Sequence, residues 1–339
     1  MQENNQAHGG ISAFYWDYTR ILGLLFLVVS LFITPPALAF VYTPGDIYST
    51  SDSAINQYAP NGSVVSSTPF AGSDLRGLTF GPGHDLYVVR AGATPFSSPS
   101  VEVFGPNGSL LRSYNFGGNV FGNISYGKIA FDPNGKDFYV GAGNGVYKFS
   151  VNGTTGSLFN STEAFDVNVL PSGQLLVASG YGLTVLSSSG AILSTISQLN
   201  DPYGLTNDPF PRLVDVRGVQ YDSANNKTYV TMLGYYGASL YGPVDMSFKL
   251  LELNGLSNEL LGLTTFTYGD DIALTNSGNL LVGSRTQSPG LFSTNLKYLG
   301  SLGGPDARFV TVPEPQSLAL VGLGLFLLGF SRRHKRSPG

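Results

Sequence analysis

The sequence predicts an all-β fold, and three features of its composition and spacing indicate this. Only 12% of the 339 residues are charged and 42% are hydrophobic, while 44 glycines accompany 22 Phe and 19 Tyr. Short apolar stretches alternate with Gly, Asn, Ser and Pro, which are the residues that form tight turns between strands. The same order of strands and turns recurs through the middle of the chain. Together these features favour many short antiparallel strands over helices.

The recurring unit contains four strands. An apolar strand, a Pro/Asn/Gly turn and a second apolar strand are followed by a third strand, a tight turn and a fourth strand. The five complete copies begin at Leu75, Gly127, Phe165, Val216 and Asp271. The turns between third and fourth strands contain Asn107-Gly108, Asn152-Gly153, Ser189-Gly190 and Asn254-Gly255. Such turn residues tolerate positive φ, as hairpins require.

Two incomplete copies remain at the ends of the domain. Residues 46–48, 55–58 and 64–65 supply a second, third and fourth strand, and residues 308–312 supply a first strand. Joined, these fragments make a sixth unit, and the array then has no open end. Roughly 45 residues per unit lies in the range of propeller repeats. We predict a six-bladed β-propeller over residues 40–312, with a seven- or eight-bladed ring as the main alternative and a β-helix as a weaker one.

The strand pattern resembles the NHL and gluconolactonase-like six-bladed propellers, whose strands read roughly L-x-G-I-A followed by G-x-L-Y-V. Residues 75–89 and 126–140 match this pattern best. The repeats of residues 40–312 lack the W-D dipeptide of WD repeats, and no pair of glycines recurs in each copy as in kelch repeats. The resemblance implies that a catalytic relative would hold a divalent metal in the central channel through Glu, Asn and Asp side chains.

The N-terminal segment predicts export. Ile21 to Thr34 is an almost unbroken apolar run, preceded by Arg20 and followed by Pro35-Pro36 and Ala37-Leu38-Ala39. A short apolar helix with an A-x-A ending is typical of a signal peptide, so residues 1–39 are expected to be cleaved after Ala39. An uncleaved membrane anchor is the alternative.

The C-terminal segment, residues 313–339, has three parts. Pro313-Glu314-Pro315 precedes an apolar stretch, residues 318–330, which ends in the basic cluster Arg332, Arg333, Lys335 and Arg336. A helix of 13 residues spans only ~20 Å, less than the ~30 Å hydrocarbon core, so it would anchor poorly. The arrangement resembles the PEP-CTERM sorting signal of Gram-negative bacteria. An ordinary C-terminal membrane anchor is the alternative.

This resemblance implies a route and a partner. It implies transient anchoring in the inner membrane, recognition at the Pro-Glu-Pro motif by an exosortase-type enzyme, removal of the tail, and delivery to the cell surface or extracellular matrix. Proteins with this signal often accompany exopolysaccharide and biofilm systems.

Composition excludes several classes of site. Residues 40–312 contain 13 Lys or Arg against 19 Asp or Glu, a balance that argues against nucleic-acid binding. Cysteine is absent, so disulfides, zinc thiolate sites and cysteine nucleophiles are excluded. His84 is the only histidine of the predicted domain, and one histidine cannot make a multi-histidine metal site. We predict no cofactor and no metal.

Each predicted first strand begins with a charged residue, and in a propeller these residues would ring the mouth of the central channel. They are Arg76, Lys128, Asp166, Arg217, Asp271 and Arg308. One interpretation is a network of mutual salt bridges, and the other is a site for an anionic or polar ligand. The four cations would repel a catalytic metal. The sequence therefore favours a non-catalytic domain, with a lactonase- or lyase-like enzyme as the alternative.

Four long segments are expected on one face of the propeller, because they join second to third strands or fourth strands to the next first strand. They are residues 90–100, 115–126, 198–215 and 232–247. They carry the aromatic residues Phe96, Phe121, Tyr203, Phe210, Tyr235, Tyr236 and Tyr241. Aromatic rings suit stacking on sugars or packing on an envelope protein, although they can also simply cover their own loops. The sequence thus predicts a surface or matrix protein that binds polysaccharide or another envelope component, or a purely structural matrix protein.

Overall fold

A computed structural model describes residues 43, 45–69, 74–92, 99–117, 127–180, 182–200, 215–236, 245–284, 286–304 and 307–312, without the side chains of 234–236 and 245–247. All of these residues belong to one compact unit that begins at Val41. Their regular structure consists of strands. Among them there is no helix of the length and apolarity that crossing a membrane would take. The helices expected in residues 1–39 and 313–339 lie outside the described residues.

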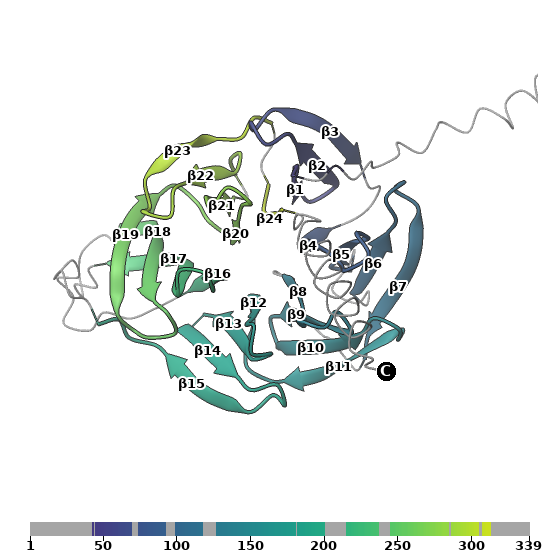
Figure 1. Cartoon of the computed structure of the whole chain (residues 1–339), viewed down its shortest axis with the longest axis horizontal. Coiled ribbons are helices and arrows are strands. Elements are labelled where there is room, and N and C mark those ends of the chain that lie inside the picture. The colour runs from purple at the N-terminus through teal and green to yellow at the C-terminus, as the bar shows by residue number, and fades with distance from the viewer. Residues whose placement is uncertain are drawn as a thin grey trace, which may run out of the picture. The chain divides into compact units, whose positions relative to one another are not determined.

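The strands form five sheets (Figure 1). Four sheets have four strands each, in hydrogen-bonded order: β24 (Phe309–Thr311), β1 (Ile47–Thr50), β2 (Ala54–Tyr58), β3 (Val64–Pro69); β12 (Asp166–Val169), β13 (Leu175–Ser179), β14 (Gly182–Leu186), β15 (Ile192–Ile196); β16 (Val216–Asp222), β17 (Lys227–Tyr236), β18 (Asp245–Asn254), β19 (Leu260–Phe266); and β20 (Asp271–Leu274), β21 (Leu280–Gly283), β22 (Gly290–Phe292), β23 (Tyr298–Ser301).

The fifth sheet has eight strands, in two antiparallel runs of four. The first run is β4 (Leu75–Phe80), β5 (Leu86–Arg90), β6 (Ser100–Phe104) and β7 (Leu110–Phe116); the second is β8 (Ile129–Phe131), β9 (Asp137–Ala142), β10 (Gly145–Ser150) and β11 (Thr155–Asn160). The two runs meet where β7 pairs in parallel with β11, through Asn115 with Thr155 and Phe116 with Gly156. In Figure 1 the sheets follow one another around a common centre, with β4, β8, β12, β16, β20 and β24 innermost. The predicted all-β propeller is confirmed.

The two chain fragments of the predicted last unit form one sheet. β24, from the C-terminal end of the described domain, pairs antiparallel with β1, through Tyr48 with Thr311 and Thr50 with Phe309. The Arg308 N–H also donates to the Thr50 carbonyl, 2.9 Å away. Strands from both ends of the domain therefore close it, as the fragments predicted.

The predicted turns between third and fourth strands lie where the sequence placed them. Gly108, Gly190 and Gly255 adopt φ values of 75°, 88° and 54°, which only glycine tolerates easily. One predicted loop is too long, because residues 232–236 and 245–247 of the segment 232–247 belong to strands. β17 continues to Tyr236 and β18 starts at Asp245, so the connection between them spans only residues 237–244. The β-branched and aromatic run of this hairpin extends the ladder beyond the length of the other copies.

Hydrophobic clusters fill the spaces between consecutive four-stranded units. In one of them Val89, Val101 and Tyr114 from β4–β7 pack against Val140 and Phe149 from β8–β11. Further clusters join the second run to β12–β15, β12–β15 to β16–β19, β16–β19 to β20–β23, and β20–β23 to the β24–β3 sheet. The units from β8 to β23 thus bury both of their faces against their neighbours, as the repeats of an array must. Between the β24–β3 sheet and β4–β7, the rings of Tyr48 and Phe80 meet edge to face.

Candidate functional site

The six charged residues predicted for the channel mouth all lie at the starts of the innermost strands. Asp166 and Asp271 open β12 and β20, Arg76 and Arg217 are the second residues of β4 and β16, and Lys128 and Arg308 directly precede β8 and β24. All except Arg217 are buried, and the Arg217 side chain is only 16% exposed. Buried charges must be paired or hydrogen-bonded, so their partners decide what this cluster can do.

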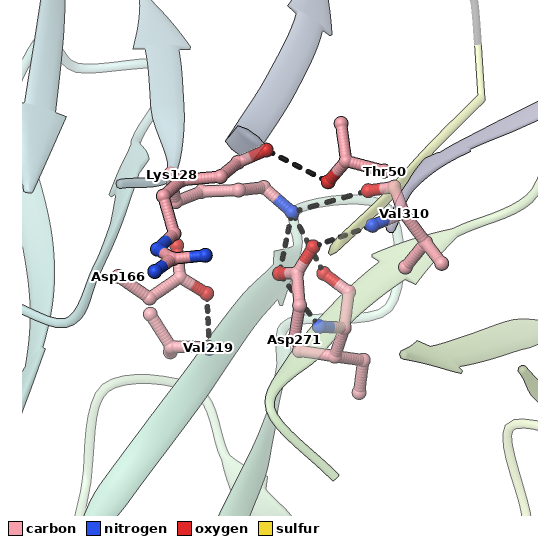
Figure 2. A network of polar contacts seen from close by, with 8 residues as sticks. Thr50, Lys128, Asp166, Val219, Asp271 and Val310 are labelled. Carbon is pink, nitrogen blue, oxygen red and sulfur yellow. Dashed lines mark hydrogen bonds and ion pairs between the residues drawn. The ribbon is translucent and has the colours of Figure 1, made fainter. Parts of the chain in front are cut away.

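Lys128 and Asp271 form a buried ion pair, although they are 143 residues apart in the sequence (Figure 2). The Lys128 Nζ lies 2.7 Å from the Asp271 Oδ1. The same ammonium group donates to the carbonyl oxygens of Ile272 and Val310, at 3.3 and 3.4 Å. Three acceptors match the three donors of an ammonium group. The contact ties the start of β8 to the β20–β23 sheet and to β24.

Each of the two aspartates accepts a backbone N–H from the next sheet around the ring (Figure 2). The Asp271 Oδ2 accepts the N–H of Val310, at 2.9 Å, and the Asp166 Oδ2 accepts the N–H of Val219, at 2.7 Å. Val219 and Val310 each lie two residues beyond the ring arginine of the next sheet, Arg217 and Arg308. Each carboxylate therefore satisfies an inward-facing N–H of an innermost strand, which has no strand partner on that side.

The arginines pair with carboxylates that the sequence analysis did not single out. Arg76 forms ion pairs with Asp52 and Asp74, and Arg217 pairs with Asp215 and Asp270 at 2.8 and 3.0 Å. The guanidinium of Arg217 also lies over the Phe248 ring, and that of Arg308 over the Phe309 ring. A sequence signal for these partners exists in the pattern Asp-x-Arg, which recurs as Asp74-Leu75-Arg76, Asp215-Val216-Arg217 and Asp306-Ala307-Arg308. Asp306 lies outside the described residues.

Burial and mutual charge shift the pKa values of the three central groups. Burial raises the pKa of Asp166 to about 8, with the charge of Asp271 adding to the shift and that of Lys128 opposing it. Burial likewise raises the pKa of Asp271, against the opposing charge of Lys128. Burial alone would lower the pKa of Lys128, but the carboxylates of Asp271 and Asp166 outweigh it and raise this pKa. At neutral pH Asp166 therefore carries a proton.

The pKa of Asp166 predicts a domain that loses stability as pH rises. An unfolded aspartate titrates near pH ~3.9, so the folded state holds the proton more tightly and unfolding releases it. The contribution of Asp166 is fully present below pH ~4 and is lost as pH rises toward 8. We expect the free energy of unfolding, measured in urea between pH 5 and 8, to fall with pH in the wild type and to fall less in Asp166→Asn. Parallel curves for the two proteins would contradict this assignment.

The candidate ligand-face aromatics are not brought together by the described part of the chain. Phe96, Phe121, Tyr203, Phe210 and Tyr241 lie outside the described residues. Tyr235 and Tyr236 occupy the last two positions of β17, paired with Met246 and Asp245, rather than the loop in which the sequence placed them. The sorting residues Pro313, Glu314, Pro315, Arg332, Arg333, Lys335 and Arg336 also lie outside the described residues. Within those residues no group of three or more His, Asp or Glu side chains is arranged to hold a metal ion.

Comparison with protein families identifies the C-terminal segment. Residues 311–336 match the PEP-CTERM protein-sorting motif. The search of curated proteins finds no significant match.

Solved structures resemble the fold. The hydrazine synthase of Kuenenia stuttgartiensis superposes with a TM-score of 0.52 at 13% identity, over 77% of this chain and 78% of that one. The extracellular domain of a hybrid two-component system from B. thetaiotaomicron gives 0.51 at 14% identity, over 83% of this chain and 36% of that one. A gluconolactonase from Xanthomonas campestris gives 0.39 at 16% identity, over 54% and 63% of the two chains.

At such identities the likeness concerns the fold alone. The motif, in contrast, implies recognition by an exosortase-type enzyme and direction to the cell surface. The chain is therefore a β-propeller protein that carries a PEP-CTERM sorting motif at its C-terminus.

Proposed function

We propose that the protein is exported across the inner membrane of a Gram-negative bacterium, sorted by an exosortase-type enzyme, and displayed at the cell surface or in the extracellular matrix. The domain divisions are those expected from the sequence: residues 1–39 are removed as a signal peptide, residues 40–312 fold, and residues 313–339 are a transient membrane anchor. The match of residues 311–336 to the sorting motif carries this proposal.

The folded part serves as a six-bladed, non-catalytic propeller. The blade count is supported by the two antiparallel runs of the eight-stranded sheet and by the hydrophobic cluster that lies between them. The non-catalytic assignment is supported by the contacts of the channel charges. Lys128 and Asp271 neutralise one another, while Arg76 and Arg217 are paired with other carboxylates. These side chains hold sheets together instead of offering open charge to a substrate.

The sorting step has a direct test. Replacing Pro313, Glu314 and Pro315 together with alanine removes the recognition motif and leaves the apolar stretch and the basic cluster intact. We expect the variant to accumulate uncut in the inner-membrane fraction, whereas the wild type loses its tail and reaches the surface. Fractionation followed by immunoblotting and mass measurement of the C-terminus reports both events. Ser337→Ala, which lies beyond the matched residues, is the control and should be processed normally. Surface delivery of the uncut triple variant would refute exosortase sorting.

The ligand proposal is a polysaccharide or another envelope component, bound through the long segments that the sequence predicts on one face, residues 90–100, 115–126, 198–215 and 232–247. The support is the aromatic content of these segments on a rigid scaffold. The test is a glycan array, including exopolysaccharide of the host strain, probed with purified full-length protein. Saturable binding that is lost in Tyr203→Ala and Tyr241→Ala supports the proposal. Turnover of a lactone or a glycan in the presence of a divalent metal would instead favour a propeller enzyme.

A further inference from the structure

Three titratable side chains from three different sheets meet in the buried centre of the domain. Lys128 precedes β8, Asp166 opens β12 and Asp271 opens β20, and their residues are 8%, 1% and 1% exposed (Figure 2). The amine nitrogen and the nearer carboxylate oxygen of Lys128 and Asp271 are 2.7 Å apart. The charge of Asp166 acts on the pKa of Lys128, and the charge of Asp271 acts on the pKa of Asp166. A lysine, a carboxylate and a neighbouring acid, all shielded from water, are the components of an amide-forming reaction.

We propose that the Nζ of Lys128 and the Cγ of Asp271 condense into an intramolecular amide bond, with Asp166 as the acid that assists the reaction. The chain contains no cysteine, so it cannot stabilise itself outside the cell with a disulfide. An amide between side chains is a crosslink that this composition permits. This inference does not depend on the proposed function.

The reaction balances without any oxidant or co-reactant. A proton moves from the ammonium of Lys128 to the carboxylate of Asp271, which leaves an amine facing a carboxylic acid. The amine lone pair forms the N–C bond at Cγ, and the Cγ–Oδ1 bond breaks. Oδ1 leaves as water, taking the proton of the acid and one proton from nitrogen. Asp166 can give a proton to the departing oxygen and recover one from nitrogen, so it ends unchanged.

The contacts around the pair favour this outcome. The Asp271 Oδ2, which accepts the N–H of Val310 at 2.9 Å, is held in place and becomes the amide oxygen. The N–H of Ile272 donates to Oδ1 at 2.8 Å, which polarises the bond that must break. Reacting groups held in contact behave as if present at ~10⁵–10⁸ M, which offsets the unfavourable equilibrium of amide formation in water. Burial by itself works toward the uncharged amine and acid that must react, against the attraction between the two charges.

Asp166 has the properties that the assisting acid needs. Its Oδ2 is fixed by the N–H of Val219, and its Oδ1 is buried with no hydrogen-bond partner. Burial and the charge of Asp271 raise its pKa, so it holds a proton at neutral pH.

Mass spectrometry of the purified full-length protein tests the proposal. The amide removes one water from the intact mass. It also blocks trypsin at Lys128, so residues 113–136 remain uncut and joined to residues 250–285 in one branched peptide. Cleavage after Lys128, together with an intact mass that matches the sequence, would overturn the proposal. This outcome does not depend on how stable any variant is.

The chain supplies its own control. Lys148 and Asp137 form an ion pair of nearly the same length, 2.8 Å, but their side chains are 35% and 26% exposed. Trypsin should therefore cleave after Lys148, and no branched peptide should contain this residue. Lys128→Arg should have the full mass of its sequence. Asp166→Asn, whose amide oxygen can still accept the Val219 N–H, should remain largely unreacted, and complete dehydration of this variant would overturn the role of Asp166.

Discussion

Relative to wild-type protein in which Lys128 and Asp271 are still an uncrosslinked ion pair, replacing Lys128 with methionine is expected to destabilise the domain by roughly 3–5 kcal/mol, the cost of breaking a buried ion pair from one side. The substitution leaves Asp271 buried without its cation and removes the donor to the Ile272 and Val310 carbonyls. It also detaches the start of β8 from the β20–β23 sheet. Urea unfolding followed by circular dichroism measures the loss, and a change below ~1 kcal/mol would contradict it.

Two further variants distinguish the cost of leaving a buried charge unpaired from the cost of losing the lysine side chain. In Lys128→Met/Asp271→Asn the second change removes the orphaned charge, while the amide oxygen still accepts the Val310 N–H. We expect this double variant to recover much of the stability, because replacing both partners of a buried pair is far less costly than removing one. Lys148→Met is the exposed counterpart, since it breaks the pair with Asp137, and it should cost less than ~1 kcal/mol.

Replacing Phe138 with alanine is expected to cost a similar amount, roughly 3–5 kcal/mol. Phe138 is fully buried in the cluster between β4–β7 and β8–β11. Its ring stacks on Phe149, with centroids 4.8 Å apart and planes 4° apart, and meets the edges of Tyr87 and Tyr114. Truncation opens a cavity and removes several aromatic contacts at once. A lowered melting temperature and urea midpoint would report the loss.

An exposed residue on an outer strand of the same sheet provides the comparison. Leu158 of β11 is 52% exposed, so Leu158→Ala should change the free energy of unfolding by no more than ~0.5 kcal/mol. Equal losses in Phe138→Ala and Leu158→Ala would show that the aromatic cluster does not stabilise the junction between the two runs.

The sequence predicted most of the fold because each repeat carries its own turn chemistry. The Asn-Gly and Ser-Gly turns fixed the order of third and fourth strands, and the partial copies at the two ends predicted the pairing of β24 with β1. The glycine of the L-x-G pattern also has a physical reason. A Cβ on Gly77 would clash with the backbone of Gly127 and Lys128, where two innermost strands approach closely.

What the sequence could not predict depends on contacts between distant residues. The parallel pairing of β7 with β11 has no local signal, because it joins the outer strands of two repeats. Periodicity predicted that Lys128 and Asp271 share one ring, but not that the two side chains meet across 143 residues. The extension of β17 through Tyr235 and Tyr236 was missed because glycines within the segment made it look like a loop. Asp52 and Asp270 were missed because neither belongs to the recurring strand pattern. Asp52 lies between β1 and β2, and Asp270 directly precedes β20.

The pairing of β24 with β1 has a consequence for how the protein is made. The residues that complete this sheet, Phe309–Thr311, are synthesised after nearly all of the domain, and their partners in β1 were made more than 250 positions earlier. The ring therefore cannot shut until the last strand of the domain has been synthesised, and contacts of such long range form slowly. The sorting motif starts at residue 311, inside this last strand. In the sorting route proposed above, β24 docks while the tail holds the chain at the membrane, and removal of the tail follows.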